Sequence, residues 1–191
     1  MKKYGITGNI ATGKSSVTSY LKQKGYVVID SDLLSHEALE MDEDCIKKTA
    51  SLFDCLEDGS INRKKLGQII FHDENAKKQL EAIIHPYVKK RIEEEIEKNK
   101  DQAIIFIDVP LLYELNWQDL FDQVIVVSCD EEIQLERFLK RNHYSKEYAF
   151  TIMNNQMSLT LKKQQANIIF DNNGTLESLY YQVDQFLKEV D

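Results

Sequence analysis

The residues best suited to chemistry lie near the start of the chain, where a glycine-rich segment fits the spacing GxxxxGK[ST] of a phosphate-binding loop. An apolar, strand-like run over 4–7 precedes it and an amphipathic stretch follows it, as such a loop requires. A tight turn that ends at a helix N-terminus points backbone N–H groups and the helix dipole at an anion. Lys14 adds a cation for the β- and γ-phosphates, and Ser15 offers a hydroxyl to Mg²⁺. The pattern predicts a nucleoside triphosphate site at Gly8, Asn9, Ile10, Ala11, Thr12, Gly13, Lys14, Ser15 and Ser16, the alternative being a plain glycine-rich turn.

Two carboxylates follow the second apolar run, at Asp30 and Asp32. At the carboxyl edge of a sheet, such a group can orient or deprotonate a hydroxyl that attacks a phosphoryl group. Asp is also a favoured N-cap, so the alternative is a structural role at the helix that starts near Leu33. One aspartate of the pair can act on the hydroxyl while the other caps the helix.

A third carboxylate, Asp108, ends the apolar run 103–108, in the pattern of a Walker B strand that holds Mg²⁺. The pattern is common, so the metal role of Asp108 stays open. The segment after it contains Pro110, Leu111 and Glu114, and Glu114 either orients substrate or caps the next helix.

A basic helix is predicted over 131–141, with apolar side chains on one face and basic ones opposite. Arg137 and Arg141 are four residues apart and therefore point the same way. They predict a clamp for the negative charge of a transferring phosphoryl group, and an exposed basic surface is the alternative.

Apolar, β-rich runs alternate with helical patterns, which predicts an α/β fold with a doubly wound, five-stranded parallel sheet. The predicted strands are 4–7, 26–29, 103–109, 123–128 and 167–170. Ligands of such sheets bind outside the carboxyl ends of the strands. With the loop after the first strand, the pattern is that of a P-loop nucleotide-binding fold.

Two inserts interrupt this alternation and set the predicted organisation of the chain. Residues 32–100 contain helical patterns, no convincing strand and a break at Pro86, and they predict a helical substrate-binding subdomain. Residues 142–165 are polar and helical and predict a lid. The core is then 1–31, 101–141 and 166–191.

The net charge of −8 argues against a nucleic-acid partner, because proteins that bind polyanions usually carry excess Lys and Arg. The sequence also lacks a stretch of the roughly 20 apolar residues that a membrane span needs, and its start has no apolar leader. We expect a cytoplasmic monomer with no membrane partner.

The sequence resembles the dephospho-coenzyme A kinase family across nearly its whole length. The resemblance rests on ordered blocks, which are ITGNIATGKSSV, VIDSDLLSHEAL, INRKKLGQIIF, LEAIIHPYV, DVPLLYE, QLERFLKRN and QMSLTLKKQQANIIFDNNG. Several blocks in the family's order are far more specific than one loop. A nucleoside or nucleotide kinase of the same fold is the alternative, and a GTP-binding switch is disfavoured because its NKxD pattern is absent.

The resemblance implies transfer of the γ-phosphoryl group of ATP to the ribose 3′-hydroxyl of dephospho-coenzyme A, with Mg²⁺. It implies that Asp32 is the general base, that Lys14, Arg137 and Arg141 are catalytic cations, and that Asn172 and Gly174 lie near adenine. The residues that it implies for the acceptor are Asp30, Asp32, Arg63, His85, Pro110, Leu111, Glu114 and Lys162.

Four positions depart from the family pattern. Asn9 and Ala11 stand where glycine is usual, Ile152 replaces a lid arginine, and Asn167 replaces an aspartate. Asn tolerates a positive φ, whereas Ala adopts one only at a steric cost, so a loop that needs this conformation at Ala11 is strained.

Overall fold

The computed structural model describes residues 1–142 and 145–190, so His143 and Tyr144 of the predicted lid lie outside the described residues. The strands are β1 (Lys2–Thr7), β2 (Val27–Asp30), β3 (Leu56–Glu57), β4 (Ser60–Ile61), β5 (Ile104–Asp108), β6 (Gln123–Ser128) and β7 (Ile168–Asp171). The helices are α1 (Lys14–Gln23), α2 (Ser31–Met41), α3 (Glu43–Leu52), α4 (Arg63–His72), α5 (Glu74–Lys98), the 3-10 helix η1 (Gln118–Leu120), α6 (Glu131–Asn142), α7 (Lys146–Asn154), α8 (Leu159–Gln165) and α9 (Leu176–Val190). Two compact units result, a core unit of residues 1–29 and 99–191 and an insert of residues 30–98.

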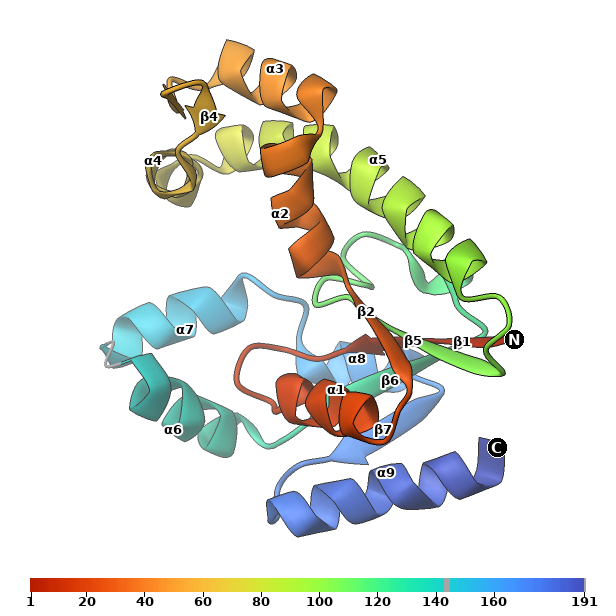
Figure 1. Cartoon of the computed structure of the whole chain (residues 1–191). Helices are drawn as coiled ribbons and strands as arrows, with labels where there is room; N and C mark the ends of the chain where they lie inside the picture. Colours follow the sequence, from red (N-terminus) through yellow and green to blue (C-terminus); the bar gives the residue numbers. More distant parts are fainter. Residues whose placement is uncertain (143–144, 191) are drawn as a thin grey trace. The chain divides into compact units, whose positions relative to one another are not determined.

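A five-stranded parallel sheet in the order β2-β5-β1-β6-β7 organises the core unit (Figure 1). β1 lies at its centre, with Ile6 opposite Asp108 of β5 and Ile125 of β6. β5 is buried at every residue, because strands of a parallel sheet covered on both faces are apolar throughout rather than alternating. The predicted fold class is therefore confirmed.

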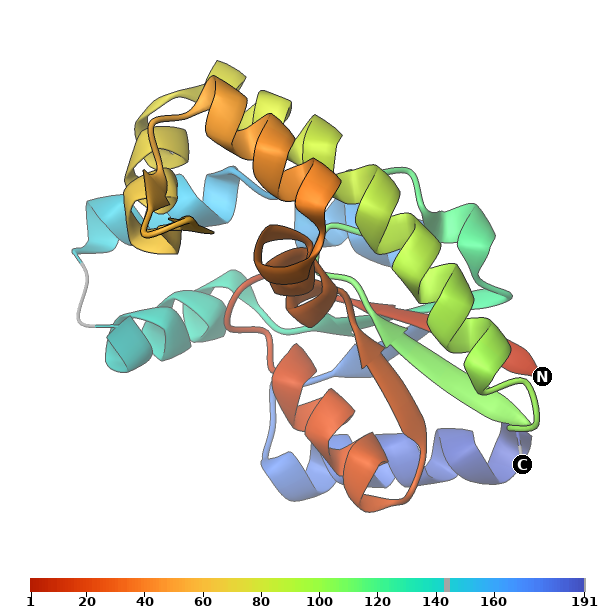
Figure 2. The same cartoon turned by 45° about the horizontal axis from the view of Figure 1, so that its top comes forward.

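One face of the sheet packs against α1 and α9, which lie on the same side of it (Figures 1 and 2). Tyr4 of β1 is 1% exposed and stacks on Phe106 of β5, with ring centroids 5.6 Å apart. Phe186 of α9 meets the Tyr4 ring edge-on at 5.1 Å. These aromatic contacts and the aliphatic residues Val17 and Leu21 of α1 form the apolar core of this layer.

The opposite face is covered by the segment after β5 and by α8, which lies against β6 on the other side from α9 (Figure 2). Gly5 of β1 faces this layer, where a Cβ atom would lie 2.7 Å from Leu112 and 2.6 Å from Phe121. Helices on both faces make the sheet doubly wound, as predicted.

The insert contains a β-hairpin, so the prediction of no strand within 32–100 is wrong. β3 and β4 pair in antiparallel fashion, with Leu56 opposite Ile61. Asp58 and Gly59 form the two-residue loop with φ values of 48° and 79°. Two positive φ values are typical of a type I′ turn, for which Asp-Gly is a preferred pair. The signal was present, but each strand is too short to show an apolar alternation.

The predicted break at Pro86 is also wrong, because α5 runs through this residue without interruption (Figure 1). Proline removes one helical hydrogen bond, yet the buried stripe Ala76, Leu80, Ile84, Val88 and Ile92 continues on both sides of it. Pro86 itself is exposed. Packing of this stripe against the other helices of the insert holds the helix together despite the missing bond.

A half-buried polar cluster joins α2 to α5 within the insert. Glu37 Oε1 accepts hydrogen bonds from the Tyr87 hydroxyl at 2.6 Å and from Arg91 Nε at 2.7 Å. Arg91 also donates to Glu94 and Glu95 at 2.6 and 3.1 Å. The bond from Arg91 is the main cause that lowers the pKa of Glu37, while burial is the main cause that raises the pKa of Tyr87 to about 12.

Across residues 1–142 and 145–190, no helix combines the length and the apolar character that crossing a bilayer requires.

The Glu37 cluster predicts a pH-dependent contribution to stability. Replacing Arg91 with Met should lower the free energy of unfolding by about 2 kcal/mol near neutral pH, because it leaves a half-buried carboxylate without its cation. Since the pKa of folded Glu37 lies below the ordinary value of 4.5, the native contribution is present above pH 4.5 and is lost as pH falls further. The difference between the two proteins should therefore shrink in acid, as measured by urea unfolding at several pH values.

The matched control is Lys90→Met, which removes a neighbouring cation whose partner Glu94 is 3.6 Å away. It should leave the free energy of unfolding close to that of the parent, because the pair is exposed. A stability difference for Arg91→Met that stays constant between neutral pH and pH 3 would contradict the assignment.

Candidate active site

The glycine-rich loop follows the central strand and ends where α1 begins at Lys14. Gly8 is required by a close approach, since a Cβ atom there would lie 2.6 Å from the carbonyl oxygen of Val127 and 2.8 Å from Thr12 Oγ1. Thr12 is fully buried, and its hydroxyl donates to the Asn9 carbonyl at 2.9 Å. The loop is therefore a tight turn pressed against β6.

Gly13 caps α1 in the left-handed region, with φ 97° and ψ 16°. A Cβ atom there would lie 2.0 Å from Asn172 Nδ2. Asn172 is 5% exposed and donates to the Thr12 carbonyl at 2.8 Å, so its side chain occupies the space that Gly13 leaves. The sequence predicted Asn172 near adenine, and its observed contact is with the loop backbone. Gly174 lies exposed in the turn between β7 and α9.

The N-terminus of α1 differs from those of other helices in having no side-chain cap and no acidic residue in its first turn. By contrast, α2, α3, α4, α7 and α8 each begin with an Asp, Asn or Ser that accepts a backbone N–H. The N–H groups of Lys14 and Ser15 have no partner within the helix. This terminus therefore offers hydrogen-bond donors and a positive dipole to an anion.

The two unusual loop residues behave differently. Ala11 has φ 62°, so the expected strain is present there, at roughly 1–2 kcal/mol for a non-glycine residue. Asn9 is not among the described residues with a positive φ, so the loop does not need a left-handed conformation at this position. Instead, its side chain donates to the Met157 carbonyl at 3.0 Å.

Lys14 and Asp108 form an ion pair between the loop and the end of β5. Asp108 is 6% exposed, so its charge lies in a largely water-excluded place beside a cation. Ser15 is exposed at the start of α1. The two oxygen donors that the sequence suggested for Mg²⁺ thus lie on neighbouring segments. Among the described residues, no group of three or more His, Cys, Asp or Glu side chains is arranged so that it could hold a metal ion.

The segment after β5 is tied to β1 and to the loop between α7 and α8. The Thr7 hydroxyl donates to the Pro110 carbonyl at 2.9 Å, and Leu111 is half-buried in the turn that follows. Glu114 Oε1 accepts from the Met157 N–H at 2.9 Å, and its Oε2 is buried without a hydrogen-bond partner. Glu114 therefore does not cap η1, the next helical turn, but reaches another segment.

Lys162 is fully buried and bonds the same two groups, Glu114 Oε1 at 2.9 Å and the Pro110 carbonyl at 3.2 Å. Burial is the main cause that lowers its pKa, and the charge of Lys14 acts in the same direction. The family resemblance implied Lys162, which lies within the predicted lid 142–165, as a residue for the acceptor. The structure places it beneath the surface, within the electrostatic reach of Lys14.

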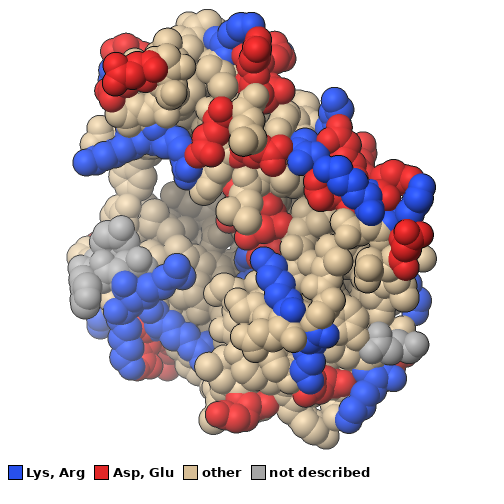
Figure 3. Space-filling view, in the orientation of Figure 1, with Lys and Arg blue, Asp and Glu red and all other residues tan. Residues whose placement is uncertain are grey.

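Arg137 and Arg141 lie on α6, over which basic side chains gather at the surface (Figure 3). Arg137 is half-buried and its Nη1 atom is buried without a hydrogen-bond partner, whereas Arg141 is exposed. The guanidinium of Arg137 faces the buried thiol of Cys129, whose pKa is raised by burial and held back by this charge. The two arginines therefore differ in how much water surrounds them.

Asp30 and Asp32 open the insert and have different environments. Asp30 is the N-cap of α2, because its Oδ1 atom accepts from the Asp32 N–H at 2.9 Å and the Leu33 N–H at 3.3 Å. The capping alternative is thus confirmed for Asp30. Asp32 lies in the first turn of α2 with an exposed side chain.

The other predicted residues of the insert lie on two helices. Arg63 begins α4 and pairs with Glu40 at 3.1 Å on the surface. His85 lies half-buried on α5, and burial lowers its pKa.

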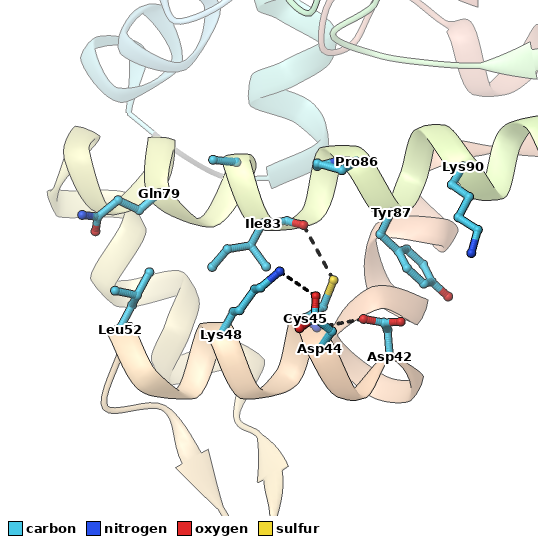
Figure 4. A pocket seen from close by; sticks show the side chains of 11 residues that line it. Asp42, Asp44, Cys45, Lys48, Leu52, Gln79, Ile83, Pro86, Tyr87 and Lys90 are labelled. Carbon is cyan, nitrogen blue, oxygen red and sulfur yellow. Dashed lines mark hydrogen bonds and ion pairs between the residues drawn. The ribbon is translucent and has the colours of Figure 1, made fainter.

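A pocket of about 550 Å³ lies between α3 and α5, with an apolar floor around Ile83 and Pro86 (Figure 4). Neither Arg63 nor His85 lines it. Its thiol, Cys45, bonds the Ile83 carbonyl at 3.7 Å, and burial raises its pKa to about 12, so it is protonated and unreactive at neutral pH.

Sequence reasoning missed residues that hold the loop from outside it. Gln134 Nε2 donates to the Ile10 carbonyl at 2.8 Å, and Gln156 Oε1 accepts from the Ile10 N–H at 2.9 Å. Gln134 is 3% exposed on α6, and a polar residue on an apolar helix face is the one sequence signal that marks it. For Gln156, between α7 and α8, no local pattern exists.

Comparisons with known proteins agree with this geometry. A family model described as dephospho-CoA kinase matches residues 3–178, which include both units. A dephospho-CoA kinase of Oceanobacillus iheyensis is 42% identical over 190 residues, covering 97% of this chain and 96% of the relative.

Two solved structures are similar to this chain over nearly its whole length. A crystal structure from Thermus thermophilus has a TM-score of 0.85 and 30% identity, covering 100% of this chain and 98% of the other. A dephospho-CoA kinase from Campylobacter jejuni has a TM-score of 0.74 and 27% identity, covering 98% and 96%. The family resemblance noted in the sequence is therefore confirmed, and this chain belongs to the dephospho-CoA kinase family.

Proposed function

We propose that this protein transfers the γ-phosphoryl group of ATP to the ribose 3′-hydroxyl of dephospho-coenzyme A, giving coenzyme A and ADP. The observation that carries the proposal is the family match over residues 3–178, because the phosphate loop alone names the donor class and not the acceptor. The loop, the insert and the basic helix α6 would supply the groups that such a transfer needs.

The phosphates of ATP would bind at residues 8–16, where the uncapped start of α1 offers N–H groups and Lys14 offers a cation. Lys14 would exchange part of its pairing with Asp108 for the β- and γ-phosphates. Asn172 would support adenine binding indirectly, by fixing the loop, and Gly174 would lie closer to the base.

Asp32 is the general base that the family resemblance implies, and its side chain is exposed, whereas the carboxylate of Asp30 caps α2. An exposed Asp two residues after β2 lies at the carboxyl end of that strand, where ligands of such sheets bind. Its role would be to orient the 3′-hydroxyl and to accept its proton.

Arg137, Arg141 and Lys162 would stabilise the charge that develops on the transferring group. Arg137 is the strongest of the three, because its buried Nη1 has an unused donor. A preorganised donor in a water-poor place is worth more in the transition state than a hydrated one. Lys162 would act as a buried positive charge behind the loop.

Mg²⁺ fits the oxygen donors at hand, namely the Ser15 hydroxyl and the Asp108 carboxylate, together with phosphate oxygens and water. This small protein share is usual, since Mg²⁺ in phosphoryl transfer is held by one or two protein groups plus substrate. When bound, the ion would neutralise charge on the phosphates.

The insert would hold the acceptor through Arg63 and His85, and the segment after β5 through Pro110, Leu111 and Glu114. Residues 142–165 would act as a lid. We also propose that the protein acts as a cytoplasmic monomer without a nucleic-acid partner. The net charge of −8 supports the absence of a nucleic-acid partner.

The acceptor is tested by incubating the protein with ATP, Mg²⁺ and a panel of dephospho-coenzyme A, nucleosides, nucleoside monophosphates and shikimate. We expect ADP release to depend on dephospho-coenzyme A, and mass spectrometry to find the new phosphate on its ribose 3′-oxygen. Turnover of a different acceptor with none of dephospho-coenzyme A would overturn the proposal.

The base is tested by Asp32→Asn, which should lower kcat by about 100-fold or more while the KM for ATP changes by no more than about threefold, since the base acts in the chemical step. Asp30→Asn is the matched control. Asn caps helices as well as Asp does, so this variant keeps the start of α2 and should lower kcat far less than Asp32→Asn does. Equal losses in the two variants would indicate a structural role for both.

The role of Arg137 is tested by Arg137→Met, which should lower kcat by roughly 100-fold, because it removes a preorganised donor. Lys140→Met is the comparison, since Lys140 is exposed on the same helix and pairs with Glu136 at 2.5 Å. Its kcat should stay within about twofold of the parent. Steady-state kinetics with both substrates varied will separate these outcomes, and an active Arg137→Met protein would remove this residue from the mechanism.

A further inference from the structure

We propose that Gln134 and Gln156 are positioning residues of the phosphate loop, which hold the Ile10 peptide so that Ala11 stays in its left-handed conformation. The inference rests on the proposed ATP-dependent function and deepens it. It names residues that act on nucleotide affinity through the loop backbone.

The first observation is that the two glutamines bond both polar groups of one residue. Gln134 donates to the carbonyl of Ile10 at 2.8 Å, and Gln156 accepts from its N–H at 2.9 Å. Because a primary amide offers both a donor and an acceptor, glutamine can meet either group of a peptide. These contacts fix the orientation of the backbone just before Ala11.

The second observation is the strain next to this clamp. The φ of 62° at Ala11 disfavours the observed loop by about five- to thirtyfold relative to an unstrained conformation. A strained backbone persists only where its surroundings over-determine it. Two sets of contacts hold the backbone here. The two glutamines bond Ile10, the residue before Ala11, and Thr12, the residue after it, bonds the carbonyl of Asn9.

The third observation concerns where the two glutamines come from. Gln134 lies on α6, which leads toward residues 142–165, and Gln156 lies in the return between α7 and α8. Asn9 adds a third contact to the same return, through the Met157 carbonyl. The segment proposed as a lid is thus bonded at both its approach and its return to consecutive residues of the phosphate loop.

The experiment is a double-mutant cycle in the full-length protein. Gln134→Met and Gln156→Met keep side-chain length and remove the hydrogen bonds, and each is made with Ala11 and with Ala11→Gly. Affinity for ADP with Mg²⁺ is measured by calorimetry, the KM values for both substrates by kinetics, and folding by thermal unfolding. Gln102→Met is the matched control, because Gln102 is exposed before β5.

We expect each glutamine variant to bind ADP about tenfold more weakly, in line with one lost hydrogen bond in a preorganised site. The KM for ATP should rise and that for the acceptor should not. Glycine adopts a positive φ without steric cost, so Ala11→Gly should reduce the tenfold loss to about threefold or less. Gln102→Met should bind ADP like the parent.

Additive losses, with no recovery by Ala11→Gly, would overturn the proposal, as would parent-like ADP affinity in the glutamine variants. If Gln134→Met does not fold, the half-exposed Gln156 carries the test alone. Failure of the proposed function is distinguishable, because it would leave ADP binding and the cycle intact while dephospho-coenzyme A is not phosphorylated.

Discussion

The constraint on which the site depends is that α1 must begin with backbone N–H groups that have no partner within the helix and are open to an anion. An uncapped helix start is unfavourable by itself, and left-handed backbone at Ala11 and Gly13 adds to this cost. Neighbouring groups therefore have to hold the turn in place. Asn172 does so from the end of β7, by donating to the Thr12 carbonyl, and the Asn9 carbonyl does so within the loop, by accepting from Thr12. The loop also packs against the buried sheet.

A second constraint is the accumulation of positive charge in an acidic protein. Lys162 is fully buried and Lys14 is largely buried, and each lies beside one carboxylate, Glu114 or Asp108. The lowered pKa of Lys162, due to burial and then to Lys14, shows that the pairing compensates desolvation only in part. An anion bound at the loop would favour the charged form of Lys162, so by linkage the charged form of Lys162 favours the anion.

The parts of this structure that sequence could predict are those encoded by local spacing. Continuous apolar runs identify β1, β5 and β6, because strands buried on both faces need no polar positions, and the spacing of Gly8, Gly13 and Lys14 identifies the loop. The hairpin at 56–61 escaped because two-residue strands have no measurable period, although Asp58-Gly59 marks its turn. The break predicted at Pro86 was wrong because a single proline ends a helix only where tertiary packing does not outweigh one lost hydrogen bond. Gln156 could not be found, and Gln134 is marked only as a polar residue on an apolar helix face, since their contacts with Ile10 join segments more than a hundred residues apart in sequence.

Ala11 illustrates why a loop can keep an unfavourable residue. Glycine would relieve the steric cost of φ 62°, but it would also widen the set of conformations open to the loop without nucleotide and to the unfolded chain. Alanine restricts this set of conformations. We propose that the hydrogen bonds of Gln134 and Gln156 to Ile10 hold the positive φ that glycine would adopt without them. The strain then lies next to the proposed phosphate site, where a bound phosphate would add contacts to the same backbone. Alanine can therefore hold a positive φ in this loop when the surrounding side chains fix the peptide before it.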